Sequence, residues 1–147
     1  MIPLPPDFKE FLQALNRSAV EYLLVGGYAV AYHGYPRTTA DIGIWIRAAP
    51  DNARRTMEAL ENFGFGGSGA SGQMFLIPGR VVRMGVPPLR IELLTSISGV
   101  DFEACYSQRM KATIDTVPVN VISKADILIN KRAAGRAKDL ADIEQLL

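Results

Sequence analysis

The chain has 147 residues, of which 48% are hydrophobic, and its 16 lysines and arginines against 15 aspartates and glutamates give a net charge of +1. This length and apolar content predict a single compact domain with its own core, over residues 1–147, and leave no room for a second domain. The near-neutral charge excludes an overall attraction to nucleic acid or to an anionic membrane, so a polyanion would have to be bound by a local group of cations.

A reducing compartment is indicated by the single cysteine, Cys105, which excludes an internal disulfide and a cysteine-based zinc site. The proline-rich start, residues 1–7, contains no apolar run typical of a signal peptide, and no segment approaches the roughly 20 apolar residues of a membrane span. We therefore expect a cytoplasmic protein with no membrane partner.

Hydrophobic periodicity in the first half of the chain predicts helices that alternate with strands, which is typical of a mixed α/β layer. Asp7 and Asp51 are the expected N-caps of the two longer helices, and Gly34 and Gly64 follow two helix ends. The expected elements are a helix over residues 7–16, a strand over 21–25, a short helix over 27–33, a strand over 42–46 and a helix from 51 to about 63.

The second half begins with the glycine-rich segment 64–72, which lacks the lysine and the Ser/Thr of a phosphate-binding loop and is interpreted as an ordinary loop. The last helix is expected to bury Leu140, Ile143 and Leu147 on one side. The expected elements are strands over residues 74–77, 81–84 and 89–94, a short helix over 102–109, a strand within 112–121, a helix from Ser123 or Lys124 to about Ala134 that ends at Gly135, and a helix over 137–147.

Two carboxylates stand out among these elements. Asp41 begins an apolar strand, and Glu92 has apolar residues on both sides in another strand. Two-metal phosphoryl transfer commonly uses carboxylates on neighbouring strands, and an Asp-x-Asp pair at positions i and i+2 directs both side chains at one metal cluster. Here the pair reads Asp41-Ile42-Gly43, so the second carboxylate is missing, and Glu92 could complete a site of two acidic ligands if its strand is a neighbour.

The chain resembles the minimal nucleotidyltransferases of the DNA polymerase beta superfamily, and most closely the abortive-infection type IV toxin-like branch. The resemblance implies the nucleotidyltransferase fold, an α/β (α+β) architecture with a small mixed sheet covered by helices and with C-terminal helices. It also implies Mg²⁺ or Mn²⁺ as cofactor, a nucleoside triphosphate as substrate and an antitoxin as a candidate partner. The segments that carry it are residues 22–30 (YLLVGGYAV), 37–42 (RTTADI), 90–95 (RIELLT) and 130–142 (NKRAAGRAKDLAD).

By this resemblance, Asp41 and Glu92 are the metal ligands and, with Lys131, the catalytic residues. Asp41 could instead cap the turn before its strand, and Glu92 could lie on a solvated sheet face. Lys131 could neutralise the leaving pyrophosphate, or could belong to a solvated helix end that is matched to the helix dipole. The residues implied to bind the nucleotide are Gly26, Gly27, Tyr28, Arg37, Thr39, Lys131, Arg136 and Asp139.

The glycines Gly26 and Gly27 would let the backbone approach a triphosphate at a helix N-terminus, although paired glycines at a strand–helix turn are often structural. Asp139 and Asp142 share a helix face and could orient Lys131 or Lys138 by charge pairing, or could simply match the helix dipole.

The expected activity is Mg²⁺-dependent transfer of a nucleoside monophosphate from a nucleoside triphosphate to a hydroxyl of RNA, protein or a small molecule, with tRNA one candidate acceptor. Gly43 puts turnover in question and leaves as the alternative a non-catalytic nucleotide-binding or protein-interaction module. Three explanations for Gly43 stay open: a degenerate member, an introduced inactivating substitution, or compensation by another carboxylate such as Asp51. The third is disfavoured because Asp51 is expected beyond the far end of the strand.

Overall fold

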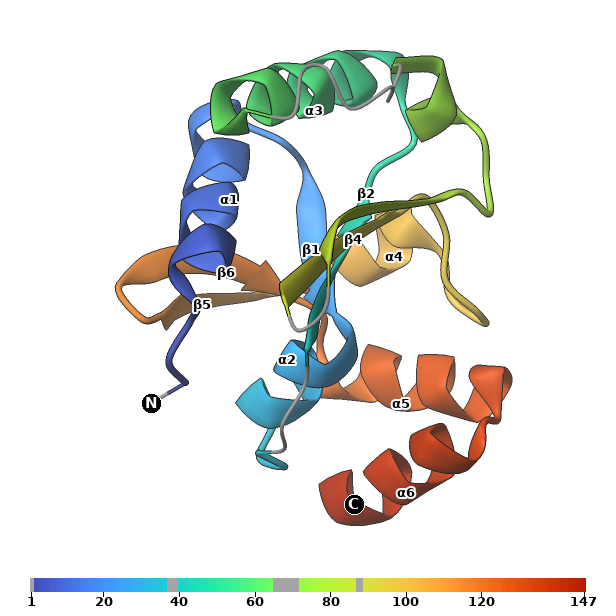
Figure 1. Ribbon diagram of the computed structural model, residues 1–147. Helices are drawn as coiled ribbons and strands as arrows, with labels where there is room; N and C mark the ends of the chain where they lie inside the picture. The colour runs from blue at the N-terminus through green and yellow to red at the C-terminus, as the bar shows by residue number, and fades with distance from the viewer. Residues whose placement is uncertain (1, 37–39, 65–71, 87–88) are drawn as a thin grey trace.

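The computed structural model describes residues 2–36, 40–64, 72–86 and 89–147 (Figure 1). Its elements, in chain order, are α1 (Pro6–Arg17), β1 (Tyr22–Val25), α2 (Gly26–Tyr32), β2 (Asp41–Ile46), α3 (Pro50–Phe63), the 3₁₀ helix η1 (Gly72–Leu76), β3 (Val81–Val86), β4 (Leu89–Leu94), α4 (Phe102–Ser107), β5 (Met110–Ile114), β6 (Val117–Val121), α5 (Lys124–Ala134) and α6 (Ala137–Leu146).

The strands form one six-stranded mixed sheet in the order β3-β4-β2-β1-β6-β5. Strand β2 runs parallel to β4 and antiparallel to β1, and β1 runs parallel to β6. Two antiparallel pairs, β3–β4 and β5–β6, complete its two edges. The expected α/β architecture with a small mixed sheet, covering helices and C-terminal helices is therefore confirmed.

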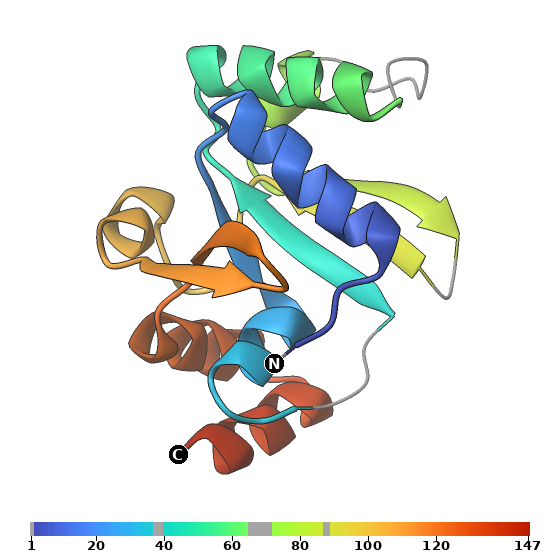
Figure 2. The ribbon, with the colours of Figure 1, turned by 90° about the vertical axis from the view of Figure 1, so that its left-hand side faces the viewer.

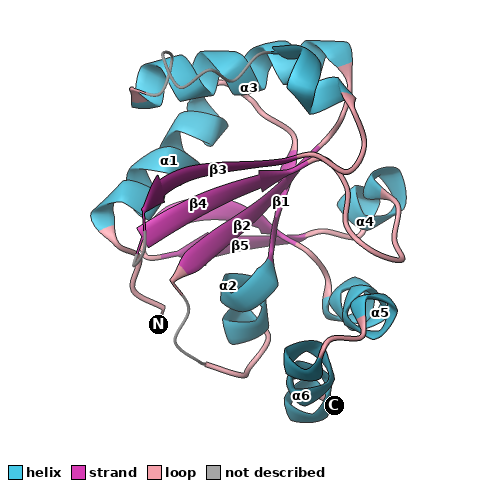
Figure 3. Ribbon diagram, turned by 45° about the vertical axis from the view of Figure 1, so that its right-hand side comes forward, coloured by secondary structure: helices cyan, strands magenta, loops and turns pink. Residues whose placement is uncertain are grey.

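Helices lie on both sides of this sheet (Figures 1 and 3). Helices α1 and α3 pack together on one side, and Figure 2 shows α1 lying across the strands with α3 beside it. Helix α5 lies toward the opposite side and packs against α6. Within the described ranges, no helix is long and apolar enough to cross a membrane.

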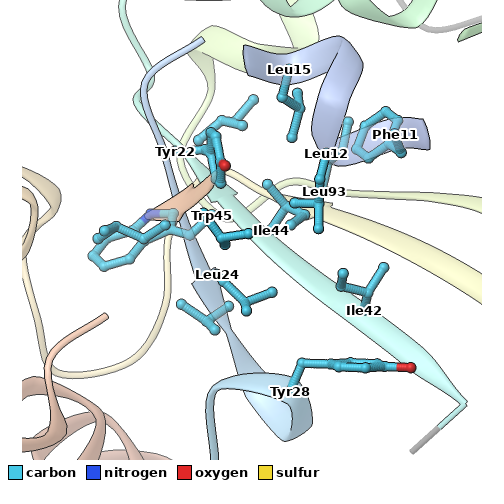
Figure 4. Close-up of a cluster of buried hydrophobic side chains, with 14 of the residues drawn as sticks. Phe11, Leu12, Leu15, Tyr22, Leu24, Tyr28, Ile42, Ile44, Trp45 and Leu93 are labelled. Carbon is cyan, nitrogen blue, oxygen red and sulfur yellow. The ribbon is translucent and has the colours of Figure 1, made fainter. Parts of the chain in front are cut away.

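The core lies between the sheet and α1, where alternate strand residues point at the helix (Figure 4). Ile42 and Ile44 of β2 are fully buried there with Leu12 of α1 and Leu93 of β4. Because side chains alternate along a strand, the intervening residues Asp41 and Gly43 face the other side of the sheet. The core therefore fixes which face of β2 is available for chemistry.

Several local predictions are confirmed by the observed helix ends. Gly64 and Gly135 end α3 and α5 in the left-handed conformation, and Ser123 caps α5 by accepting a hydrogen bond from the Asp126 amide. Left-handed residues at these positions favour glycine because a Cβ would be strained.

Other local predictions were wrong. Asp7 and Asp51 are not N-caps: Pro5 and Ala49 take those positions, and both aspartates lie in the first turn of their helices. Residues 72–76 form a 3₁₀ helix rather than the strand expected over 74–77, because Phe75 turns into the core. By contrast, the strand expected within residues 112–121 is confirmed as β6, and β5 pairs with it to form a hairpin.

Helix α6 buries a different side from the one expected. Ile143 is buried as predicted, but Leu140 and Leu147 are exposed and Leu146 is buried in their place. Asp139 and Asp142 share the buried side, which the apolar pattern alone could not indicate.

Candidate functional site

A cavity of about 540 Å³ opens on the side of the sheet opposite α1, where β1 passes into α2 and where β2 and β4 run side by side. Its volume is in the range of small-molecule sites. Sheet residues form one wall, the segment after β4 forms a second, and α5 and the start of α6 form the third. The lining residues are Val25, Gly26, Gly27, Asp41, Gly43, Val81, Arg83, Glu92, Leu94, Ser96, Ile97, Ser98, Asn130, Lys131, Ala134, Arg136 and Lys138.

The glycine pair lies at the junction of β1 and α2. Val25 is extended, and Gly26 then has a φ of +70°, in the region that favours glycine. A Cβ at Gly26 would meet no atom within 4 Å, so backbone conformation rather than crowding selects glycine there. Both glycines line the cavity and expose main chain to it.

The sheet wall brings the two predicted carboxylates onto one face. In the parallel register, Gly43 lies opposite Glu92 and Asp41 lies opposite Arg90. In the antiparallel register of the next pair, Arg83 lies opposite Glu92. Residues directly opposite one another share a face of the sheet. The condition set for Glu92, that its strand neighbours the strand of Asp41, is therefore met.

Each carboxylate is held by an arginine on the neighbouring strand. Asp41 accepts two hydrogen bonds from Arg90, from Nε to Oδ1 at 3.2 Å and from Nη2 to Oδ2 at 2.9 Å. Glu92 accepts one from Nε of Arg83 at 3.0 Å. The hydrogen bonds from Arg90 lower the pKa of Asp41, and the nearby charge of Lys138 acts in the same direction.

Gly43 supplies no carboxylate at the second position of the Asp-x-Asp pair, but the structure leaves space there for a side chain. A Cβ there would lie 3.3 Å from Cγ2 of Val25 and 3.5 Å from the Val25 carbonyl oxygen, so a side chain requires a shift of a few tenths of an ångström. Gly43 is not among the residues with positive φ, so its backbone suits any residue. An aspartate at this position would stand directly beside Glu92.

The helical wall is organised around Lys131, whose side chain is only 5% exposed. Its Nζ lies 3.1 Å from Oδ1 of Asp139 and 3.2 Å from Oδ2 of Asp142. The predicted charge pairing of these aspartates with Lys131 is therefore observed, and Asp139 also lies in the first turn of α6, where it suits the helix dipole. The triad also connects α5 to α6, because it joins one side chain of the first helix to two of the second.

Asp139 also fixes the start of α6. Its Oδ2 accepts hydrogen bonds from Nε of Arg136 at 2.7 Å and from the Arg136 amide at 3.2 Å. Burial alone would raise the pKa of Asp139, but the hydrogen bonds from Arg136 and Lys131 outweigh it and lower that pKa. The arrangement places Arg136 and Lys138 on the cavity wall that faces Asp41 and Glu92.

The donor set fits one magnesium ion better than two. Among the described residues, no group of three or more His, Cys, Asp or Glu side chains could hold a metal. Asp41 and Glu92 nevertheless lie on adjacent strands, and both line the cavity. Mg²⁺ is commonly held by one or two carboxylates together with substrate phosphates and water. These two residues therefore suit a single magnesium ion that a phosphate chain helps to coordinate.

Some predicted site residues lie elsewhere. Tyr28 is buried and packs edge-on against Phe8, with ring centroids 5.8 Å apart, and it is not a lining residue of the cavity. Arg37 and Thr39 fall outside the described residues. Asp51 lies on α3 and pairs with Arg54, so it does not take the place of the carboxylate missing at Gly43.

Arg83, Arg90 and Lys138 are site residues that sequence reasoning missed. Arg90 precedes Glu92 by two positions in one strand, and that spacing was a signal that both side chains share a face. Arg83 could not be found in this way, because its place beside Glu92 depends on the β3–β4 register.

Comparisons with known proteins agree with this fold. A family model described as "Nucleotidyltransferase of unknown function (DUF6036)" matches residues 4–147. The chain is also similar to a solved structure described as an antigenic nucleotidyltransferase-like protein from Paracoccidioides brasiliensis, with 17% identity, a TM-score of 0.55, and coverage of 99% of this chain and 76% of that one. No curated protein matches the sequence. The matches support the nucleotidyltransferase-like fold but not the toxin-like branch in particular.

Proposed function

Since the chain belongs to the nucleotidyltransferase family of unknown function DUF6036, we propose that it binds a nucleoside triphosphate in the cavity between the sheet and α5 and transfers the nucleoside monophosphate to a hydroxyl acceptor. The observation that carries this proposal is the pair of carboxylates, Asp41 and Glu92, on adjacent parallel strands at the wall of that cavity. Acidic side chains opposite a basic helical wall suit a substrate that carries both phosphates and a divalent cation.

Asp41 and Glu92 would hold one Mg²⁺ or Mn²⁺ ion. When bound, that ion would supply charge neutralisation at the phosphate that undergoes transfer. Among the described residues that line the cavity, Asp41 and Glu92 are the only carboxylates, so the substrate phosphates themselves would complete the coordination.

The basic residues have separate tasks in this proposal. Lys138 and the 61%-exposed Arg136 would contact the phosphate chain, because they line the cavity from α6. Lys131 would act mainly as a positioning residue, because its ammonium already lies between Asp139 and Asp142. The bare main chain at Gly26 and Gly27 would let phosphate oxygens approach the backbone.

A non-catalytic nucleotide-binding module is the second candidate, and two observations favour it. Gly43 supplies no ligand, and both remaining carboxylates are already hydrogen-bonded to arginines. Such a module would bind the triphosphate through the basic wall and would transfer nothing to an acceptor.

Transfer can be tested with each of the four nucleoside triphosphates, labelled at the α-phosphate, incubated with Mg²⁺ or Mn²⁺ and with RNA, protein and small-molecule fractions. The variants are the wild type, Gly43→Asp, and each of these combined with Asp41→Asn. Asp51→Asn is the matched control, because it removes a carboxylate from α3, on the other side of the sheet. We expect label on an acceptor from Gly43→Asp at least, and its loss when Asp41→Asn is added but not with Asp51→Asn.

The outcome of this assay separates the two candidates. Labelling by both the wild type and Gly43→Asp supports a working transferase in which the third carboxylate is dispensable. Labelling by Gly43→Asp alone supports an intact site that is limited at one position. No labelling by either protein, with triphosphate binding retained, rejects transfer to the acceptors offered and supports the binding module.

A further inference from the structure

The charges of strands β2, β3 and β4 that face the cavity side of the sheet form a balanced set. They lie in two rows that cross the strands. Asp41 lies opposite Arg90 in one row, and Glu92 lies opposite Arg83 in the other. Gly43 is the uncharged member of the row that holds Glu92. A third carboxylate at that position would leave one negative charge unpaired, whereas the glycine leaves none.

We propose that Arg90 and Arg83 act as positioning residues that hold Asp41 and Glu92 in the nucleotide-free protein and keep a divalent cation off this face until a triphosphate arrives. This inference rests on the proposed function, because it describes how the same site acquires its metal. The cation then enters together with the triphosphate, and the arginines exchange a carboxylate partner for a phosphate partner.

The geometry of the Arg90 pair supports this role. Its two hydrogen bonds engage both oxygens of Asp41, and the side chains are 32% and 30% exposed, so the pair is neither fully solvated nor sealed from a ligand. A divalent cation would have to displace the guanidinium or share the carboxylate with it at close range, which like-charge repulsion opposes. In the nucleotide-free protein, the Asp41 carboxylate paired with Arg90 is therefore a poorer metal ligand than its exposure suggests.

Arg83 is suited to partner exchange, because its side chain is 56% exposed while that of Glu92 is 21% exposed. Its Nε donates a hydrogen bond to Glu92, and Arg83 lines the cavity. A guanidinium has five N–H donors and binds phosphate oxygens in a fork-like geometry. Arg83 can therefore turn toward a phosphate and release Glu92 to a metal without an uncompensated charge.

Metal affinity without nucleotide gives a direct test, since Mn²⁺ binding can be followed by electron paramagnetic resonance. Arg90→Gln should raise Mn²⁺ affinity by roughly fivefold or more, because it releases a partly exposed ion pair. Arg90→Lys should raise it less, because the charge stays while the two-point contact is lost. Arg54→Gln, which removes the same charge on α3, should leave the affinity within about twofold of the wild type.

Asp41→Asn in the Arg90→Gln background should return Mn²⁺ affinity to the wild-type value, because the released ligand is then removed. Equal Mn²⁺ affinity for Arg90→Gln, Arg54→Gln and the wild type would overturn the inference. If Arg90→Gln does not fold, Arg83→Gln and Arg90→Lys carry the same test.

Inorganic tripolyphosphate, titrated calorimetrically in EDTA, separates this inference from the proposed function. We expect binding to the wild type that Arg83→Gln weakens several-fold and Arg54→Gln does not. Tripolyphosphate binding that Arg83→Gln leaves unchanged would refute the partner exchange and leave the proposed nucleotide site standing. Absence of tripolyphosphate binding, with Mn²⁺ affinity still raised in Arg90→Gln, would refute that nucleotide site and support metal exclusion by Arg90.

Discussion

Replacing Lys131 by methionine should destabilise the fold at neutral pH, in addition to any effect on the site. The lysine is the shared cation of Asp139 and Asp142, whose side chains are only 0% and 3% exposed. Methionine keeps most of the apolar stem, so the loss is chiefly electrostatic. Breaking a buried pair from one side costs about 3–5 kcal/mol, because a buried charge is left without its partner.

The low end of that range, about 3 kcal/mol, applies here. Asp139 keeps its hydrogen bonds from Arg136, at 2.7 Å from Nε, so only part of its compensation is lost. For a chain of this length, that change lowers the melting temperature by about 6–12 °C. Urea unfolding of Lys131→Met and of the wild type, monitored by circular dichroism at pH 7, measures the difference directly.

Lys124→Met is the matched control, because Lys124 is an exposed residue at the start of the same helix and should change stability by no more than about 0.5 kcal/mol. Adding Asp142→Asn to Lys131→Met should recover part of the loss, because one of the two stranded charges is removed. The deficit should also shrink as the pH falls toward 4, because loss of Lys131 removes one of the hydrogen bonds that lower the pKa of Asp139, and protonation of Asp139 then removes its stranded charge. Equal urea midpoints for Lys131→Met and Lys124→Met would refute this view of the triad.

Three further predictions follow from local environments. Gly43→Asp should lower the free energy of unfolding, measured in urea, by no more than about 1–3 kcal/mol, because its Cβ would lie 3.3 Å from Cγ2 of Val25. Gly43→Ala is the uncharged control. Loss of folding in both variants would contradict the expectation that this position accepts a side chain. Burial raises the pKa of Cys105 to about 12, so at pH 8 the thiol should react with a disulfide reagent only when urea unfolds the protein. Rapid modification of the native protein would contradict the burial of this thiol. Burial likewise raises the pKa of Tyr22 from 10.0 to about 12, so the unfolded state ionises first and stability is lost as pH rises from 10 toward 12, by at most about 2.7 kcal/mol. Urea unfolding at pH 9 and pH 11 should show this alkaline loss in the wild type and a smaller one in Tyr22→Phe; equal losses would exclude Tyr22 as the cause.

The order of helices and strands could be read from the sequence because its signals are local. Runs of apolar residues predicted β2 and β4, and glycines marked the ends of α3 and α5. Asp41 and Glu92 were identifiable for a related reason, since a carboxylate in an otherwise apolar strand stands out from its neighbours. The sequence also revealed the gap at Gly43, because positions i and i+2 of a strand share a face.

The helical side of the site was less accessible to sequence reasoning. Lys131 was singled out as a phosphate contact, but its partners Asp139 and Asp142 lie on the buried side of α6, whereas the apolar pattern predicted burial of Leu140 and Leu147. A buried ion cluster is invisible to hydrophobic periodicity, because charged residues then occupy core positions.

What only the tertiary structure decided is which charge stands beside which. The carboxylates of Asp41 and Glu92 are held by Arg90 and Arg83 because of the β2–β4 and β3–β4 registers, which a shift of one residue would undo. Strand register depends on contacts between segments far apart in the chain, and no local pattern records it. The sequence by itself therefore determined the elements and the candidate ligands. The packing of the sheet determined that these carboxylates face a cavity and that each is paired with an arginine.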